Sequence, residues 1–598
     1  MSHALYRLGR WTARHPWRTI VAWVVLAVVV ITASVTWGRE LRDSFNVPGV
    51  DSDRATQLLS TAQSADAGVT ARVVATPRDA ASLSGAEAGR ALAELREELS
   101  AIDGVVAVTA PQLSGDGKVA LLTVQYPVLE DLDSGDLTRL KDVLDHFDDS
   151  ALRVEAGGEL FFHLEAAGGG SSEAIGILAA VVILLIAFGS VVAMGLPIVT
   201  ALVGLAIGMS SLGLVTYLIE IPSDAPGMAA MVGIGVGIDY ALFLVTRYRE
   251  FVASGSNTED AVGRSLATAG QAVLFAGGTV VVAILGLAVA GVPMMTAAGV
   301  ATSTVVAVEV VAALTLLPAL VALSASWIDR LSIHRRGTAP SGRRAAQWAG
   351  HVSRHPWPYA VGGTLALLAL TVPMFRLELG FPDEGTMPPS RTERRAYDLV
   401  SDGFGPGVNG PLLIAVDLSG ATGDPTTILA DLGKAVSADE GIATVYPAQV
   451  DRGSRVATIV AIPTTKPQAA ATYDTVKRLR SDVFPGALDG SGASAHVGGA
   501  TANFGDIAGR VTDRLPLFVG SVLLLSFLLL MVVFRSVLVP LKAALLNLLS
   551  IGAAYGVMVM VFQWGWGKDL IGLDSTLPIV SLIPMFMFAV LFGLSMDY

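Results

Sequence analysis

Cysteine is absent from the 598 residues, and charged side chains make up only 15% of them. Without cysteine the chain forms no disulfide, thiolate nucleophile or thiolate-ligated metal centre. A soluble protein of this length would carry about 25% charged residues, so this shortage, with 52% hydrophobic residues, favours a membrane protein. The eight histidines are scattered and form no H-E-x-x-H sequence, so we expect no metal site and no cofactor. No catalytic triad or phosphate-binding loop stands out, and we expect no enzyme.

The chain contains long apolar runs that are candidate membrane spans. A helix needs roughly 20 apolar residues to cross about 30 Å of hydrocarbon, and ten runs are candidates. The predicted spans are residues 19–37, 174–188, 194–219, 228–246, 272–291, 297–323, 357–375, 515–534, 538–562 and 576–598.

The spans repeat their order within the chain, which predicts two related halves. Arg-His-Pro-Trp stands before the first span at 14–17 and again before the seventh at 354–357. Each half reads as one span, one large polar segment and then a helical bundle, a layout typical of transporters. The predicted divisions are 1–37 (N-terminus and first span), 38–173 (first polar domain), 174–328 (five-span bundle), 329–356 (basic loop), 357–375 (seventh span), 376–514 (second polar domain) and 515–598 (last three spans).

The two polar segments have the patterns of folded α/β domains. Short alternating runs predict strands, and leucines at helical spacing, as in Leu92, Leu95 and Leu99, predict amphipathic helices. Their alternation indicates small βαβ-type domains. The predicted elements include strands at 69–75, 119–125, 412–416 and 456–462 and a helix at 86–101.

Arginine in the short loops predicts the orientation. Arg7, Arg10, Arg14 and Arg18 precede the first span, and the loop at 329–355 is also arginine-rich. Because short basic loops stay in the cytoplasm, we expect a multi-pass protein of the cell membrane with a cytoplasmic N-terminus and both polar domains outside. The basic clusters are those that orient the chain, so nucleic acid is not an expected partner.

The fourth span contains the sequence Gly233-Ile-Gly235-Val-Gly237-Ile-Asp239-Tyr240. Asp239 lies eleven residues into the span, about 17 Å at 1.5 Å per residue, so it is near the membrane midplane. A charged aspartate there costs about 2.5–3.5 kcal/mol, and no lysine or arginine lies at membrane depth. We therefore predict reversible protonation of Asp239, with protons as the coupling ion. The adjacent Tyr240 hydroxyl is its expected hydrogen-bond or proton-relay partner.

The second half repeats this arrangement as Gly593-Leu-Ser-Met-Asp597-Tyr598. The alternative to proton coupling is a carboxylic acid bonded permanently to a hydroxyl across a helix interface. The glycines, Gly233, Gly235, Gly237 and Gly593, are predicted to allow close helix packing at the relay.

Glu309 is a second acid within a predicted span, the sixth. It either joins the same proton path as a secondary relay or lies near a helix end and reaches water. The sequence leaves both open.

These motifs resemble those of the MmpL ("mycobacterial membrane protein, large") branch of the resistance–nodulation–division superfamily. The sequence at 233–250 is similar to its fourth-helix signature, residues 592–598 to its tenth, and residues 314–320 to the end of its sixth. The resemblance implies a polytopic α-helical protein with an internal two-fold repeat, twelve helices in full and two extracytoplasmic α/β porter domains. It also implies proton-driven export of lipids or hydrophobic drugs, with relay roles for Asp239, Tyr240, Asp597 and Tyr598.

The chain departs from this pattern in two places. Ala276 stands where the family often has a serine, and the sequence stops within the tenth span, so we expect a fragment of a longer protein. Membrane lipids and a lipid or hydrophobic small-molecule substrate are the expected partners, and a homo-oligomer is compatible with the sequence. Two alternative functions stay open, a non-transporting lipid- or sterol-sensing regulator and an accessory protein for protein export.

Overall fold

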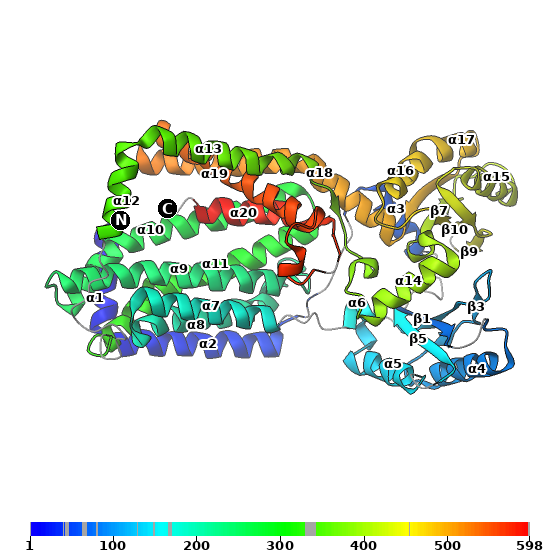
Figure 1. The fold of residues 1–598 in the computed structure, drawn as a ribbon, viewed down its shortest axis with the longest axis horizontal. Coiled ribbons are helices and arrows are strands. Elements are labelled where there is room, and N and C mark those ends of the chain that lie inside the picture. The colour runs from blue at the N-terminus through cyan, green and yellow to red at the C-terminus, as the bar shows by residue number, and fades with distance from the viewer. Residues whose placement is uncertain are drawn as a thin grey trace.

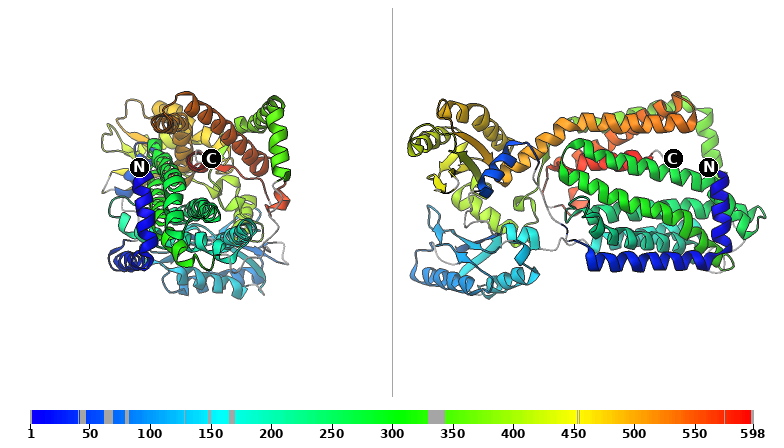
Figure 2. Two further views of the ribbon diagram at one scale, coloured as in Figure 1. Left: turned by 90° about the vertical axis from the view of Figure 1, so that its left-hand side faces the viewer. Right: turned by 180° about the vertical axis from the view of Figure 1, so that it is seen from behind.

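A helical bundle and a pair of α/β domains make up the structure, a computed structural model (Figure 1). The domains sit at one end of the bundle, the domain end. The opposite end is crossed by α1 (Ser2–Arg14), and we call it the α1 end (Figure 2). The structure describes residues 2–39, 41, 47–61, 69–78, 82–127, 129–147, 150–164, 170–328, 343–451, 453, 455–573 and 575–595.

Every predicted span contains a helix of the bundle. Within the described ranges, eight helical segments are long and apolar enough to cross a membrane, and two further apolar helices are shorter. The eight segments contain α2 (Pro16–Trp37), α8 (Val191–Val215), α9 (Ala225–Ala253), α10 (Thr258–Leu285) with η3 (Gly286–Ala290), α11 (Pro293–Ser324), α13 (Pro356–Thr371) with η4 (Val372–Arg376), α18 (Ala500–Phe534), and α19 (Leu538–Met558) with η8 (Val559–Gln563); the shorter two lie in α7 (Gly170–Phe188) and α20 (Ile583–Ser595).

Two spans differ from their predicted limits at the domain end. Helix α18 begins at Ala500, inside the segment predicted as polar domain, and runs without a break into the bundle. The tenth span begins later than predicted, because residues before α20 include β12 (Ile579–Val580). This strand pairs in parallel with β6 (Leu379–Gly380), just after the seventh span. Residues 576–582 are therefore not helical as predicted, and they include the strand that pairs with β6.

A short helix precedes the first span of each half, α1 in the first and α12 (Arg343–Arg354) in the second. Helix α1 packs on α10: Tyr6 donates a hydrogen bond of 2.6 Å to Asp260, and Arg14 pairs with Glu259 at 2.7 Å. The side chain of Asn257 caps α10 by accepting from the Asp260 backbone. These contacts fix α1 across the end of the bundle.

The two α/β domains share one topology, which is the internal repeat in three dimensions. The first sheet has the order β2-β4-β1-β5 and the second the matching order β11-β7-β10-β8. The predicted strands and the helix at 86–101 are confirmed, but adjacent strands are antiparallel. The reason is that β4 lies between β1 and β2, and β10 between β7 and β8, as in a split βαβ unit.

The elements of the first domain are β1 (Thr70–Pro77), α4 (Ala86–Ala101), β2 (Ala107–Val108), β3 (Gln112–Leu113), β4 (Ala120–Gln125), α5 (Ser134–His146), β5 (Leu152–Gly157) and α6 (Glu159–Leu164). Those of the second are β7 (Leu412–Asp417), α15 (Pro425–Ser437), β8 (Ile442–Val445), β9 (Gln449–Asp451), β10 (Val456–Pro463), α16 (Ala470–Arg478), α17 (Phe484–Leu488) and β11 (Ser494–Gly498). Each sheet packs its helices around a separate apolar core.

The two domains exchange a helix. Helix α3 (Asp51–Thr61) precedes the first sheet in the chain, but it packs on β11 and β7 of the second sheet. Helix α14 (Thr392–Phe404) precedes the second sheet and packs on β5 and β1 of the first. The boundaries 38–173 and 376–514 therefore describe the chain order, and each folded domain contains a helix from the other segment.

Ion pairs hold both exchanged helices. On α3, Asp51 accepts from His496 and pairs with Arg480 at 2.7 Å, and the same Arg480 pairs with Asp506 of α18 at 2.6 Å. On α14, Arg395 pairs with Glu155 of β5 at 2.6 Å. Burial raises the pKa of Glu155, but hydrogen bonds from Arg395 and neighbouring groups outweigh it and hold the pKa below its usual range.

We predict that Arg395→Gln destabilises the protein by about 1 to 3 kcal/mol, because Glu155 then loses a charged partner while buried. Its neighbour Arg394 pairs with the half-exposed Asp398 within α14, so Arg394→Gln should cost less than about 1 kcal/mol. Denaturant unfolding of the purified variants measures both. Since the lowered pKa of Glu155 stabilises the fold only above that pKa, the Arg395→Gln deficit should shrink as the pH falls. Equal effects of the two variants would contradict the exchange contact.

Candidate functional site

Asp239 and Tyr240 lie at the midpoint of α9, within the bundle. Asp239 is partly buried, and Tyr240 is 3% exposed. The Tyr240 ring lies against α10, since a Cβ added at Gly277 would be 3.4 Å from its Cε2 atom. The nearest arginines in sequence are Arg247 and Arg249, more than two turns further along α9. The fold therefore holds an acid and a hydroxyl at mid-helix depth.

Glu309 lies at the midpoint of α11 and has no exposed surface. It is thus too far from either helix end to reach water by extending its side chain, and that alternative reading of the sequence is wrong. Neither carboxyl oxygen has a hydrogen-bond partner among the described residues. A buried polar group without partners is unusual enough to require an explanation.

Glycines on α8 and α9 make the space for Glu309. A Cβ added at Gly204 would lie 2.7 Å from the Glu309 carboxyl carbon, and one at Gly237 would also overlap the carboxyl group. One turn away, a Cβ at Gly233 would lie 2.5 Å from Val305 of α11. The close packing predicted for Gly233 and Gly237 is therefore present, and it faces α11.

Not every predicted glycine has this role. Gly593 of α20 also packs closely, because its added Cβ would lie 2.9 Å from Val280 Cα of α10. Gly235 is exposed, and an added Cβ there would meet no described atom within 4 Å. Sequence reasoning missed Gly204 and Gly208, although their G-x-x-x-G spacing on α8 is the same signal that singled out Gly233 and Gly237.

The second acid–tyrosine pair, Asp597 and Tyr598, lies outside the described residues. Its predicted relay role stays a prediction. Helix α20, which leads to it, packs on α10 of the first half through Gly593. The helix carrying the second motif thus packs against a helix of the first half.

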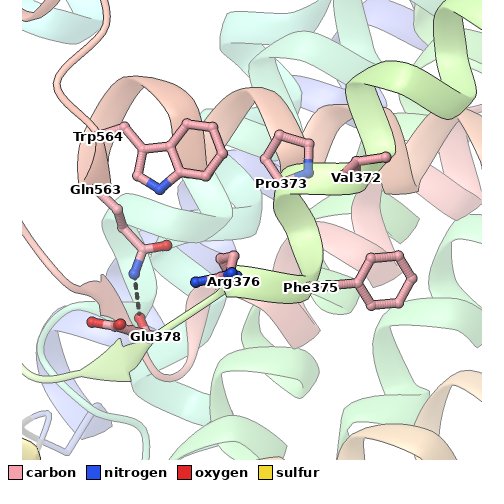
Figure 3. Close-up of a pocket in the computed structure, with 7 residues that line it drawn as sticks. All are labelled: Val372, Pro373, Phe375, Arg376, Glu378, Gln563 and Trp564. Carbon is pink, nitrogen blue, oxygen red and sulfur yellow. Dashed lines mark hydrogen bonds between the residues drawn. The ribbon is translucent and has the colours of Figure 1, made fainter.

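A cavity of about 670 Å³ opens where the seventh and ninth spans end, at the foot of the domains (Figure 3). Arg376 and Trp564 face it from the two spans, and Gln563 crosses between them to donate a 3.1 Å hydrogen bond to the Glu378 carbonyl. The Arg376 guanidinium has no hydrogen bond or ion pair among the described residues. The lining residues are Val372, Pro373, Phe375, Arg376, Glu378, Gln563 and Trp564.

A titratable acid stands just outside the bundle, between the seventh span and α14. Burial raises the pKa of Asp383 to about 6, although the Gly385 backbone donates to it. Burial and the neighbouring Asp383 carboxyl also raise the pKa of Tyr397. This acid therefore changes its charge near neutral pH at the domain end.

One histidine spacing was overlooked in the prediction that no metal site exists. His351 and His355 stand four residues apart on α12, and their rings are 4.8 Å between centroids. A zinc site needs three or four ligands. No cluster of three or more potential His, Cys, Asp or Glu ligands occurs in the part of the chain that the structure describes, so the pair alone carries no metal assignment.

The chain matches the model of the MMPL family over residues 44–359 and 433–598. It is 35% identical over 608 residues to membrane protein YdfJ of Bacillus subtilis, covering 100% of this chain and 82% of that protein. It is 32% identical over 426 residues to the mycolic acid-containing lipids exporter MmpL11 of Mycolicibacterium smegmatis, covering 70% of this chain and 44% of that protein. It is 30% identical over 423 residues to the heme uptake protein MmpL11 of Mycobacterium tuberculosis, covering 70% of this chain and 43% of that protein.

We predict that Gly204→Ala destabilises the bundle by about 1 to 3 kcal/mol, the usual cost of overpacking a filled core. Gly195→Ala, on the same helix, is the matched control, since its added Cβ meets no described atom within 4 Å. Removing a helical glycine there should be neutral or stabilise by about 0.5–1 kcal/mol. Thermal unfolding in detergent compares the two. A Gly204→Ala variant as stable as Gly195→Ala would mean that α8 and α11 are not packed through Glu309.

Proposed function

The chain belongs to the MMPL family of membrane transporters, and on that premise we propose that it exports lipids or other hydrophobic molecules from the cytoplasmic membrane, driven by protons. The observation that carries this proposal is the acid at the midpoint of α9, with a buried tyrosine beside it. A carboxyl group at that depth is costly when charged. An acid at this depth is therefore expected to have a function that depends on its protonation.

In this mechanism protons bind to Asp239 from the outside and leave to the cytoplasm, and Asp597 and Tyr598 act in the second half as Asp239 and Tyr240 do in the first. Each proton that moves down the membrane potential delivers roughly 2.3 kcal/mol per 100 mV. Neutralising the carboxyl removes a charge penalty of similar size. Protonation therefore changes which arrangement of the helices is favoured.

Arginine supports an orientation with the α1 end in the cytoplasm. Arg7, Arg10 and Arg14 belong to α1, and Arg18 begins the first span. Because cytoplasmic loops collect lysine and arginine, the two α/β domains then lie outside the membrane. The substrate is released on that side.

Within the described residues, two continuous connections are available to carry a helix shift to the domains. Helix α13 leads through η4 into the second polar segment, and α18 extends from the bundle to the second domain. On α18, Asp506 binds Arg480 of the second domain and accepts from the Ser52 backbone of α3 at 3.0 Å. A tilt of α18 thus pulls on both the second sheet and the exchanged helix.

A lipid-like substrate is supported by the cavity beside Arg376 as well as by the lipid exporter among the relatives. At the outer ends of the seventh and ninth spans, the cavity lies at headgroup level in the proposed orientation. Trp564 is of the type that sits at membrane interfaces, and Phe375, which also lines the cavity, is highly exposed. An arginine without a partner there suits a phosphate or another anionic headgroup.

Asp239→Asn should abolish proton-driven export. The amide cannot exchange a proton, while its size and hydrogen-bonding capacity are nearly unchanged. The measurement is accumulation of a fluorescent hydrophobic dye in cells that express the full-length protein, with and without a protonophore. Both the variant and the protonophore should raise accumulation to the level of cells without the protein.

Glu250→Gln is the matched control, an acid-to-amide change at the exposed end of the same helix, and it should export normally. Export by Asp239→Asn at the wild-type rate would exclude coupling through this residue and favour a regulator without turnover. If the wild type moves no dye, lipid profiling of a deletion strain replaces the dye as the readout. Unchanged lipids would then count against export.

Arg376→Gln should weaken binding of an anionic phospholipid roughly 10- to 150-fold, because a charge-assisted hydrogen bond contributes about 1.5–3 kcal/mol. Arg376→Lys, which keeps the charge, should retain most of the binding. Photo-crosslinking with a headgroup-labelled phosphatidylglycerol, mapped by mass spectrometry to the peptide containing Trp564, measures it. Equal crosslinking in Arg376→Gln and wild type would show that the cavity does not select a headgroup by charge.

A further inference from the structure

Glu309 occupies a closed socket between three helices. It extends from α11 to the point where Gly204 of α8 and Gly237 of α9 come closest to it, and Ala201 borders the same space. Two helices thus both omit a side chain where the carboxyl group sits. The sequence makes room for this acid rather than merely tolerating it.

No cation compensates Glu309 from the elements packed against α11. Helix α8 carries no titratable side chain, and α9 carries Asp239 and Tyr240 at this depth. The charged groups of α1, α2 and α10 lie at the α1 end, Glu259, Asp260 and Arg264 among them. A charged carboxylate without a partner costs far more to bury than a neutral carboxylic acid. This packed arrangement therefore suits the acid with its proton bound.

The socket and the Asp239 side chain lie on different sides of α9. Gly237, which faces Glu309, and Asp239 are two residues apart on α9, so their directions differ by about 200° around the helix axis. Asp239 and Glu309 are consequently on opposite sides of α9. Neither can replace the other by a simple change of side-chain rotamer.

A second polar atom lies on the same stripe of α11. Thr302 is seven residues before Glu309, two helical turns nearer the domain end and on the same face. It has no exposed surface, and its hydroxyl oxygen also has no hydrogen-bond partner among the described residues. The α8–α9–α11 interface thus encloses two polar groups of α11 without partners among the described residues, about 10 Å apart along the helix.

We propose that Glu309 is a second proton-binding site of the bundle, distinct from Asp239, which holds its proton while α8, α9 and α11 are packed together and releases it when they separate. The proposal rests on proton-driven transport as the function of the bundle. It adds a proton that is exchanged at the α8–α9–α11 junction, so that opening this junction is itself proton-dependent. Glu309 binds the coupling ion directly.

The test reads the proton without relying on transport. Infrared difference spectra of the full-length protein in lipid vesicles, recorded between acid and alkaline pH, should contain a protonated-carboxyl band that Glu309→Gln removes. A hydrophobic carbodiimide, which modifies protonated carboxyl groups in apolar surroundings, should label Glu309 at acid pH and lose that labelling at alkaline pH. Glu250→Gln is the matched control and should leave both signals unchanged.

The neutral amide of Glu309→Gln keeps the shape of the protonated acid, so the variant should fold with wild-type thermal stability. Glu309→Asp, one methylene shorter, is the second variant and should keep a protonated-carboxyl band at a shifted position. A spectrum without any band lost in Glu309→Gln would overturn the proposal. A band present at every pH would do so too, because the proton would then be permanent. If Asp239→Asn exports normally but the Glu309 band titrates, the proposed coupling residue is wrong while the second site stands.

Discussion

The packing of α11 against glycines of α8 and α9 is the contact on which the bundle's chemistry depends. Gly204, Gly208, Gly233 and Gly237 let the helices approach until Val305 and Glu309 fill the space between them. In hydrocarbon, helices gain little from apolar burial and associate through close van der Waals contact and polar groups. The same surface therefore supplies both the cohesion of the bundle and the enclosure that makes Glu309 costly to ionise. Any change in this helix packing therefore also changes how completely Glu309 is enclosed.

The two α/β domains are tied to this bundle by interactions that cross between the two halves. Because α3 packs on the second sheet and α14 on the first, neither domain is complete from its own segment, and the domains cannot separate without breaking paired charges. Arg480 illustrates the arrangement, since it binds Asp51 of the exchanged helix and Asp506 of α18 together. A membrane helix, a domain and the exchanged helix thus meet at one guanidinium. A movement of α18 would therefore act on both halves.

The sequence allowed the local structure to be predicted far better than the tertiary contacts. Apolar runs and alternating residues predicted the spans and the strands, because both signals lie within ten to twenty residues. The exchange of α3 and α14 was missed, since it depends on contacts between residues more than 230 positions apart in the sequence. The helix at 500–514 was predicted as part of a polar domain because it contains charged residues such as Asp506 and Arg510. In the structure these residues contact Ser52 and Pro48 of the first polar segment. Glu309 was left undecided, because only packing distinguishes an acid that reaches water from one enclosed by glycines on other helices.

The two acids of the first half differ in a way that gives α9 a central position. Asp239 and Glu309 lie on opposite sides of this helix, so a rotation or shift of α9 changes the surroundings of both at once. The cost of one charge at the membrane centre, about 2.5–3.5 kcal/mol, is close to the roughly 2.3 kcal/mol per 100 mV that one proton supplies. Binding or loss of one proton therefore changes the relative free energies of two packings of α9 by an amount of this order, provided that the packings differ mainly in whether an acid is enclosed. Asp239 of α9 and Glu309 of α11 allow that balance to be changed from either side of α9.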